Sequence, residues 1–172
     1  EENQPGGNGD IPGSFVTPNL DGPPPQFNIS ALPTVEVDAV AASDGTNFMV
    51  AYQALGSVGV SQFWNTFARR ITPAGVVSSP VQVNQGTSAD HWSLALKFDG
   101  ARYLLVWPRD LSAGFPAPAA WDLAGRFLTP AGLPWGNELP VATAAGRRVL
   151  PSPASAAPAS PPASPHPARQ PP

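Results

Sequence analysis

An internal repeat constrains this chain more than any other feature of its 172 residues. Residues 44–52 read DGTNFMVAY and residues 99–107 read DGARYLLVW, an offset of 55. Further along, residues 71–75 read ITPAG and residues 128–132 read LTPAG, an offset of 57. A period in this range is typical of proteins in which each repeat folds as one supersecondary unit. We therefore expect two copies of one unit, with the two extra residues in the loop between the motifs.

Each unit contains four short segments in which β-branched and aromatic residues dominate, as they do in strands. The predicted strands cover residues 35–41, 48–52, 63–72 and 81–84 in the first unit, and 92–98, 103–107, 121–129 and 139–143 in the second. The sequence thus predicts an all-β fold of two four-stranded antiparallel blade-like repeats. Such repeats can form a propeller-like array or a small sandwich.

Two kinds of turn separate these segments. Asp-Gly is a tight hairpin signal, because glycine accepts a positive φ and aspartate tolerates it. In Thr-Pro-Ala-Gly, proline presets φ at the first central position of the turn. The predicted structural turn residues are Asp44, Gly45, Asp99, Gly100, Pro73, Gly75, Pro130 and Gly132.

These motifs resemble a β-propeller-like tandem repeat of large secreted and surface proteins of bacteria. That repeat reads Asp-Gly-x-x-aromatic-x-x-x-Trp, then Asp-x-x-Gly-x-x-apolar-Ser/Thr-Pro-x-Gly. The second unit matches it through Asp99, Gly100, Tyr103, Trp107, Asp122, Gly125, Thr129, Pro130 and Gly132. The first unit departs from it at Tyr52, where Trp is usual, and at Asn65 and Ala68, which replace the Asp and Gly. The resemblance covers about residues 35–146 and implies a secreted or cell-surface location, but no particular activity.

Two blades are too few to close a propeller, which typically has 4–8. Each blade buries its faces against its neighbours, so two units alone leave apolar faces uncovered. We weigh three solutions: a piece of a longer protein, a ring of several chains, or two sheets packed face to face. If several chains form a ring, the expected partner of this chain is another copy of itself.

Proline divides the chain into a centre and two ends. Of 24 prolines, six fall in residues 1–28 and nine in residues 151–172. We expect residues 1–28 to be a flexible spacer after a lipidated or processed N-terminus, although the chain has no cysteine to carry a lipid. Residues 29–91 and 92–146 are then the two repeats. The Pro/Ala/Ser-rich tail, residues 147–172, lies where a third blade would begin, and is either natural or the frame-shifted continuation of a longer array.

Charge and composition exclude several function classes. The 122 residues between the proline-rich ends carry eight acidic and eight basic side chains, whereas a nucleic-acid binder needs a basic face. The absence of cysteine excludes disulfides, zinc-thiolate sites and thiol catalysis. No apolar run approaches the roughly 20 residues of a transmembrane helix. No calcium loop and no phosphate-binding loop is present, so we expect no metal and no cofactor.

The catalytic inventory is small. His91 and His166 are the only histidines, and we expect both in exposed, unreactive segments. A Ser-His-Asp site would need His91 beside a serine and an aspartate, yet the chain has no Gly-x-Ser-x-Gly elbow. We therefore expect a protein that is not an enzyme.

The five tryptophans remain as candidates for recognition. We expect Trp107 and Tyr52 in the repeat cores, and Trp64, Trp121 and Trp135 as candidate aromatic platforms for a ligand such as a glycan. The leading hypothesis is a secreted or surface-attached β-repeat protein with a structural or adhesive role. The alternatives are a carbohydrate-binding propeller assembled from several chains, and a fragment of a propeller hydrolase.

Overall fold

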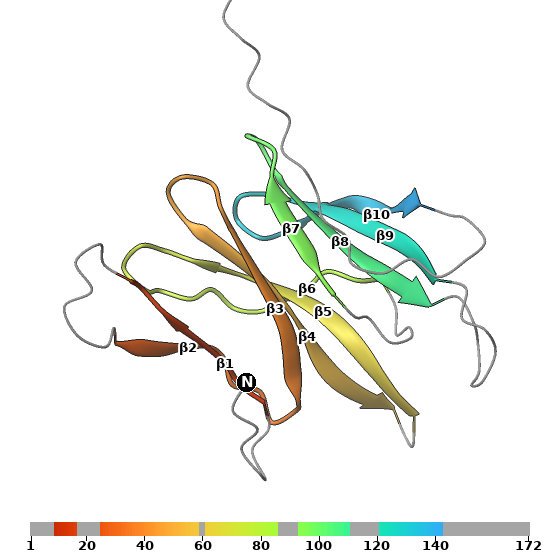
Figure 1. Cartoon of the computed structure of the whole chain (residues 1–172), viewed down its shortest axis with the longest axis horizontal. Helices are drawn as coiled ribbons and strands as arrows, with labels where there is room; N and C mark the ends of the chain where they lie inside the picture. The colour runs from red at the N-terminus through yellow and green to blue at the C-terminus, as the bar shows by residue number, and fades with distance from the viewer. Residues whose placement is uncertain (1–8, 17–24, 59–60, 86–92, 111–120, 143–172) are drawn as a thin grey trace, which may run out of the picture.

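The computed structural model describes residues 9–16, 25–58, 61–85, 93–110 and 121–142. Within these ranges the chain is all-β, as the sequence predicts, with ten strands and no helix. The strands, in chain order (Figure 1), are β1 (Ile11–Ser14), β2 (Gln26–Ser30), β3 (Glu36–Ser43), β4 (Phe48–Val58), β5 (Ser61–Ile71), β6 (Val81–Gln82), β7 (Ala95–Phe98), β8 (Tyr103–Asp110), β9 (Trp121–Leu128) and β10 (Pro134–Ala142).

Strands β3 to β10 form two sheets that match the two repeats. The first sheet has the order β3-β4-β5-β6 and the second has the order β10-β9-β8-β7, so each is a simple antiparallel meander. The eight strands expected from the sequence are all present. Strand β10 begins at Pro134, earlier than expected, because Trp135 pairs with Phe127 directly after the turn.

Equivalent turns of the two repeats make equivalent hydrogen bonds. The carboxylate of Asp44 accepts the N–H groups of Thr46 (2.8 Å) and Asn47 (2.6 Å). The carboxylate of Asp99 accepts those of Ala101 (2.8 Å) and Arg102 (2.7 Å). The glycine after each aspartate has a positive φ, 90° at Gly45 and 100° at Gly100, which explains why glycine stands there. The two repeats therefore share the hydrogen bonds of this turn as well as its sequence.

The Thr-Pro-Ala-Gly turns also agree with each other. The N–H of Gly75 donates to the carbonyl of Thr72 (2.9 Å), and the N–H of Gly132 donates to the carbonyl of Thr129 (2.8 Å). Both glycines have a positive φ, 80° and 84°. In each repeat this turn, with Pro73 or Pro130 inside it, leads from the third strand toward the fourth.

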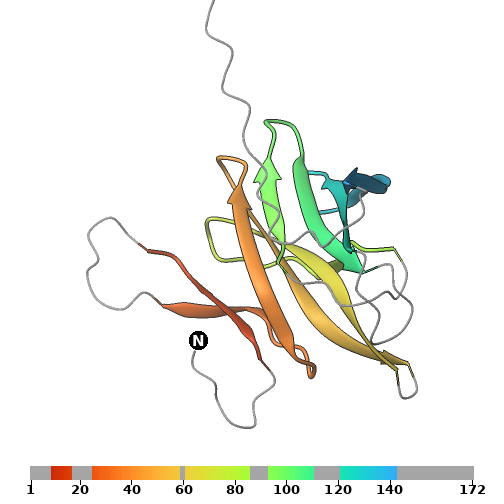
Figure 2. The same ribbon diagram turned by 45° about the vertical axis from the view of Figure 1, so that its right-hand side comes forward.

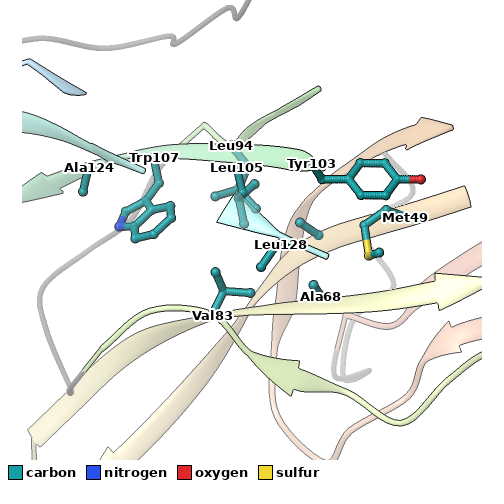
Figure 3. Close-up of a cluster of buried hydrophobic side chains, with 10 residues drawn as sticks. Met49, Ala68, Val83, Leu94, Tyr103, Leu105, Trp107, Ala124 and Leu128 are labelled. Carbon is teal, nitrogen blue, oxygen red and sulfur yellow. The ribbon is translucent and has the colours of Figure 1, made fainter. Parts of the chain in front are cut away.

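The two sheets lie face to face and enclose one apolar core (Figure 3). The first repeat contributes Met49, Ala51, Ala68 and Val83, and the second repeat contributes Leu94, Tyr103, Leu105, Trp107, Ala124 and Leu128. The side chains alternate along each strand, so only every second residue of β4 and β8 enters this core. Trp107 is its largest fully buried side chain.

The space between the sheets is bridged differently at its two edges. At one edge, β3 of the first sheet and β7 of the second lie next to each other. Near β6 and β10, long side chains make the connection: Arg126 donates to the carbonyl of Val83 (2.6 Å), and the carboxylate of Glu138 accepts the N–H of Gln85.

A third layer, the β1–β2 hairpin, covers the other face of the first sheet (Figure 2). A second apolar cluster fills this interface, with Ile11 and Ile29 from the hairpin and Val50, Tyr52, Ala54 and Ile71 from the sheet. The expectation of a flexible spacer over residues 1–28 is therefore corrected at Ile11–Ser14 and at the start of β2. Apolar side chains at alternate positions outweigh the high proline and glycine content there, because the Tyr52 face of the sheet offers them a surface to pack on.

Candidate functional site

The structure separates the predicted tryptophan platforms. Trp64 is half-buried on β5 and pairs with Leu55, on the face of the first sheet that is turned toward the second. Trp121 begins β9 opposite Asp110, and its side chain lies outside the described residues, as does Trp92. Trp135 on β10 is 53% exposed. Trp64 and Trp135 belong to different sheets and different faces, so they do not form one site.

Trp135 stands in a cluster with a cation and a second aromatic ring. Its ring meets that of Phe127 edge to face, with 6.2 Å between centroids and an interplanar angle of 84°. The guanidinium carbon of Arg102 lies 4.1 Å from the centroid of Trp135 and 4.6 Å from that of Phe127. Both distances are within the range of a cation–π contact. The arginine therefore holds the exposed indole in a defined orientation.

The hairpin turn that precedes β8 positions this arginine. Asp99 accepts the backbone N–H of Arg102, which fixes the start of β8. The N–H groups of Arg102 and Ala101, and then the nearby positive charge of Arg102, lower the pKa of Asp99 below 3.8. The turn motif of the repeat and the aromatic cluster are thus connected through one residue.

The cluster belongs to a wider apolar surface on the second sheet. Cross-strand pairing places Lys97, Leu104, Phe127 and Trp135 on the same face, and Leu139 joins them through its pairing with Gly125. Val141 packs against Gly125: a Cβ atom added to Gly125 would lie only 2.9 Å from a methyl carbon of Val141. We call this surface the outer face; its side chains are Lys97, Arg102, Leu104, Phe127, Trp135, Leu139 and Val141.

The outer face differs from the other apolar faces of the molecule in its exposure along β10, whereas Ala95 and Val106 on the same face are buried. Leu139 is 42% exposed and Val141 47% exposed, whereas Met49 and Tyr52 on the two faces of the first sheet are completely buried. Monomeric proteins rarely show large contiguous apolar patches, and those that exist commonly mark interaction sites. The outer face is therefore the strongest candidate for a functional site among the described residues.

A polar cluster lies buried under the β1–β2 hairpin, and no sequence motif indicates it. The hydroxyl of Ser30 donates to the carboxylate of Glu36 and is hydrogen-bonded to the hydroxyl of Tyr52 (3.0 Å). Burial raises the pKa of Tyr52, and the hydrogen bond with Ser30 partly offsets that shift. Beside it, the guanidinium of Arg69 donates to the carbonyl of Ile29. These bonds join the hairpin to the first sheet, so we assign them a structural role.

The described residues contain no group of three or more histidine, cysteine, aspartate or glutamate side chains that could hold a metal ion. His91 and His166 lie outside the described residues. No helix in the described part of the chain is long and apolar enough to cross a membrane. No family model, curated protein or solved structure matches this chain.

Proposed function

We propose that this chain is a non-catalytic β-repeat module with a structural or adhesive role in a secreted or surface-attached protein. The observation that carries the proposal is the outer face, where Trp135 is held by Arg102 and surrounded by apolar side chains. Aromatic residues and arginine are the side chains most enriched among those that dominate binding energy in protein interfaces.

The remainder of the molecule supports a scaffold role. The two sheets share one apolar core with Trp107 at its centre, and short hydrogen-bonded turns close each hairpin. Such packing fixes the orientation of the outer face relative to the rest of the chain. An adhesive module needs this rigidity, because ordering a mobile surface on contact would cost conformational entropy.

The outer face also supports the proposal that the isolated chain self-associates. Two copies that pair through this face would bury Trp135, Leu139 and Val141 of both. The same pairing brings Lys97 and Arg102 of each copy into one interface, so like charges oppose it. We therefore expect weak association that increases with salt, because salt screens this repulsion.

Light scattering after size exclusion tests this proposal on the full chain. Over a roughly hundredfold concentration range, the wild-type mass should rise above 17.8 kDa at the upper end. The double variant Trp135→Ala, Leu139→Asp should stay at the monomer mass. Val76→Asp is the matched control, since Val76 is 63% exposed but lies in the turn of the first repeat, and it should behave as wild type.

Carbohydrate binding is the second candidate, and the exposed ring of Trp135 favours it. Aromatic faces stack on sugar rings, and the guanidinium of Arg102 adds hydrogen-bond donors beside the indole. A glycan array with wild type and Trp135→Ala distinguishes the candidates. Specific signals that Trp135→Ala abolishes would favour the carbohydrate function. A silent array together with a strictly monomeric wild type would contradict both.

The non-catalytic part of the proposal is tested by activity. Generic ester and glycoside substrates should remain intact in the presence of the full chain at high concentration. Turnover that survives repeated purification would refute it and would revive the alternative of a fragment of a propeller hydrolase.

A further inference from the structure

The two sheets contact the layer before them through the same repeat positions. Arg69 and Arg126 are equivalent, 57 residues apart, like the two Thr-Pro-Ala-Gly turns. Arg69 of the first sheet donates to the carbonyl of Ile29 in the hairpin, and Arg126 of the second sheet donates to the carbonyl of Val83 in the first. Each sheet therefore reaches back to its predecessor with the same side chain.

The apolar contacts follow the same rule. Val50, Tyr52 and Ile71 of the first sheet face the hairpin. Their equivalents in the second sheet, Leu105, Trp107 and Leu128, face the first sheet. The three layers are thus stacked head to tail, and the sheets are not related by a pseudo-two-fold axis that would turn equivalent faces toward each other.

Head-to-tail stacking gives every sheet a forward face that receives the next layer. In the first sheet, Met49 and Ala51 occupy this face and are completely buried by the second sheet. The turn at Gly132 approaches them so closely that a Cβ atom there would lie 3.3 Å from the methyl carbon of Met49. The equivalents of Met49 and Ala51 are Leu104 and Val106. Both belong to the face of the second sheet that is turned away from the core, so the outer face is a forward face. Val106 is already buried there, beside Val141, whereas Leu104 is half-buried.

We propose that the outer face is a docking surface for a further four-stranded sheet of the same repeat pattern. The incoming sheet would present the face that carries its aromatic residue, as Trp107 does toward the first sheet. Its Thr-Pro-Ala-Gly turn would cover Leu104, and its arginine would donate to a carbonyl at the end of β10. This inference rests on the proposed function in one respect, since it takes the outer face as an interaction surface and names the partner.

A second copy of this chain fits the surface less well than a further repeat. In such a copy the Tyr52 face is covered by the hairpin, and the Trp107 face is covered by the first sheet. Among the apolar sheet faces that the structure describes, its outer face is the one that keeps exposed side chains. Pairing two outer faces opposes Lys97 and Arg102 to their counterparts. A further repeat brings an uncovered aromatic face and avoids this repulsion.

The experiment extends the full chain by one unit. A duplicate of residues 83–142 is inserted after Ala142, so that the added unit follows β10 as the second repeat follows β6. If it docks, the extended chain should unfold in one transition whose midpoint is at least about 5 °C above that of the original chain. Hydrogen exchange of β8, β9 and β10 in the receiving sheet should slow by about tenfold or more.

Two variants of the extended chain locate the effect. Trp107→Ala in the duplicated unit alone, or Leu104→Asp in the receiving sheet alone, should remove both the midpoint shift and the added protection. Val76→Asp in the extended chain should keep them, because Val76 lies away from the outer face.

An extended chain that keeps the original midpoint, unfolds in two independent transitions or aggregates would overturn the inference. So would a midpoint shift that survives Trp107→Ala in the duplicated unit. This failure is distinguishable from that of the proposed function, because the light-scattering test uses the chain without the added unit. A strictly monomeric original chain counts against adhesion, whereas an undocked duplicate counts only against the repeat as partner.

Discussion

The two ends of the stack differ in what they show to solvent. At one end the β1–β2 hairpin turns Ile11 and Ile29 inward and exposes Pro12, Gln26 and Asn28. At the other end the second sheet exposes Trp135, Leu139 and Val141. Repeat arrays need terminal caps with a polar outer surface, and the hairpin has that character. The hairpin end therefore shows a polar surface to solvent, whereas the outer face shows an apolar one.

The strongest test of this comparison places a charge at each end. Ile29→Asp should destabilise the protein by about 4 kcal/mol, because an unpaired carboxylate would be buried against the Tyr52 face. Leu139→Asp should change the free energy of unfolding by less than about 0.5 kcal/mol, because Leu139 is already in contact with water. Urea titrations with unchanged slope measure both values.

Ile29→Val controls for the loss of packing volume and should cost only about 1 kcal/mol. Equal losses from Ile29→Asp and Leu139→Asp would break the comparison, since they would mean that the outer face is as well covered as the hairpin interface.

The next test compares three arginines. Arg126→Met keeps the aliphatic packing but leaves the carbonyls of Val83 and Gly136 without their donor, at a cost of about 1–3 kcal/mol. Arg69→Met should cost about the same, because it removes the equivalent bond to Ile29. Arg102→Met on the outer face should cost less than about 1 kcal/mol, the usual size of an exposed cation–π contact.

Urea unfolding of the three variants gives the order directly. If Arg102→Met proved the most destabilising, the outer face would be a structural surface of the isolated chain. If Arg69→Met and Arg126→Met differed widely, the repeat would not extend to the contacts between layers.

The sequence predicts the local features of this fold well and the tertiary ones poorly. The Asp-Gly and Thr-Pro-Ala-Gly turns determine their own backbone geometry, so the strands between them could be placed without knowledge of the fold. The β1–β2 hairpin was missed because its glycines and prolines indicate a linker, while its pairing depends on the Tyr52 face, which lies far away in the sequence. Local patterns carry no information of that kind.

The candidate site shows the same division. The sequence treats Trp64 and Trp135 as equal candidates. Only the pairing of their strands shows that Trp64 faces the space between the two sheets and that Trp135 lies on the outer face. Arg102 was not singled out, although it immediately precedes β8 in the repeat motif. Its position between two rings follows from the pairing of β8, β9 and β10, which the repeat spacing alone does not reveal.

The smallest expected effect concerns acid stability at the two aspartate turns. Asp44 borders the interface between the sheets, and Asp99 borders the outer face. The backbone N–H groups of Asn47 and Thr46 lower the pKa of Asp44 below 3.8, and those of Arg102 and Ala101 do the same for Asp99. Because the charged form is favoured in the folded state, each aspartate stabilises the protein above pH 3.8, and this contribution is lost as the pH falls below that value.

Asp44→Asn and Asp99→Asn should therefore each reduce the difference in urea midpoint between pH 7 and about pH 2.5. The two reductions should be similar, because the largest causes of both pKa shifts are backbone hydrogen bonds within the turn itself. A clearly larger reduction for Asp44→Asn would show that the adjacent layer adds to the turn, and that Asp99 lacks this contribution only because nothing is docked on the outer face. In the extended chain, Asp99→Asn in the receiving sheet should then approach the value of Asp44→Asn.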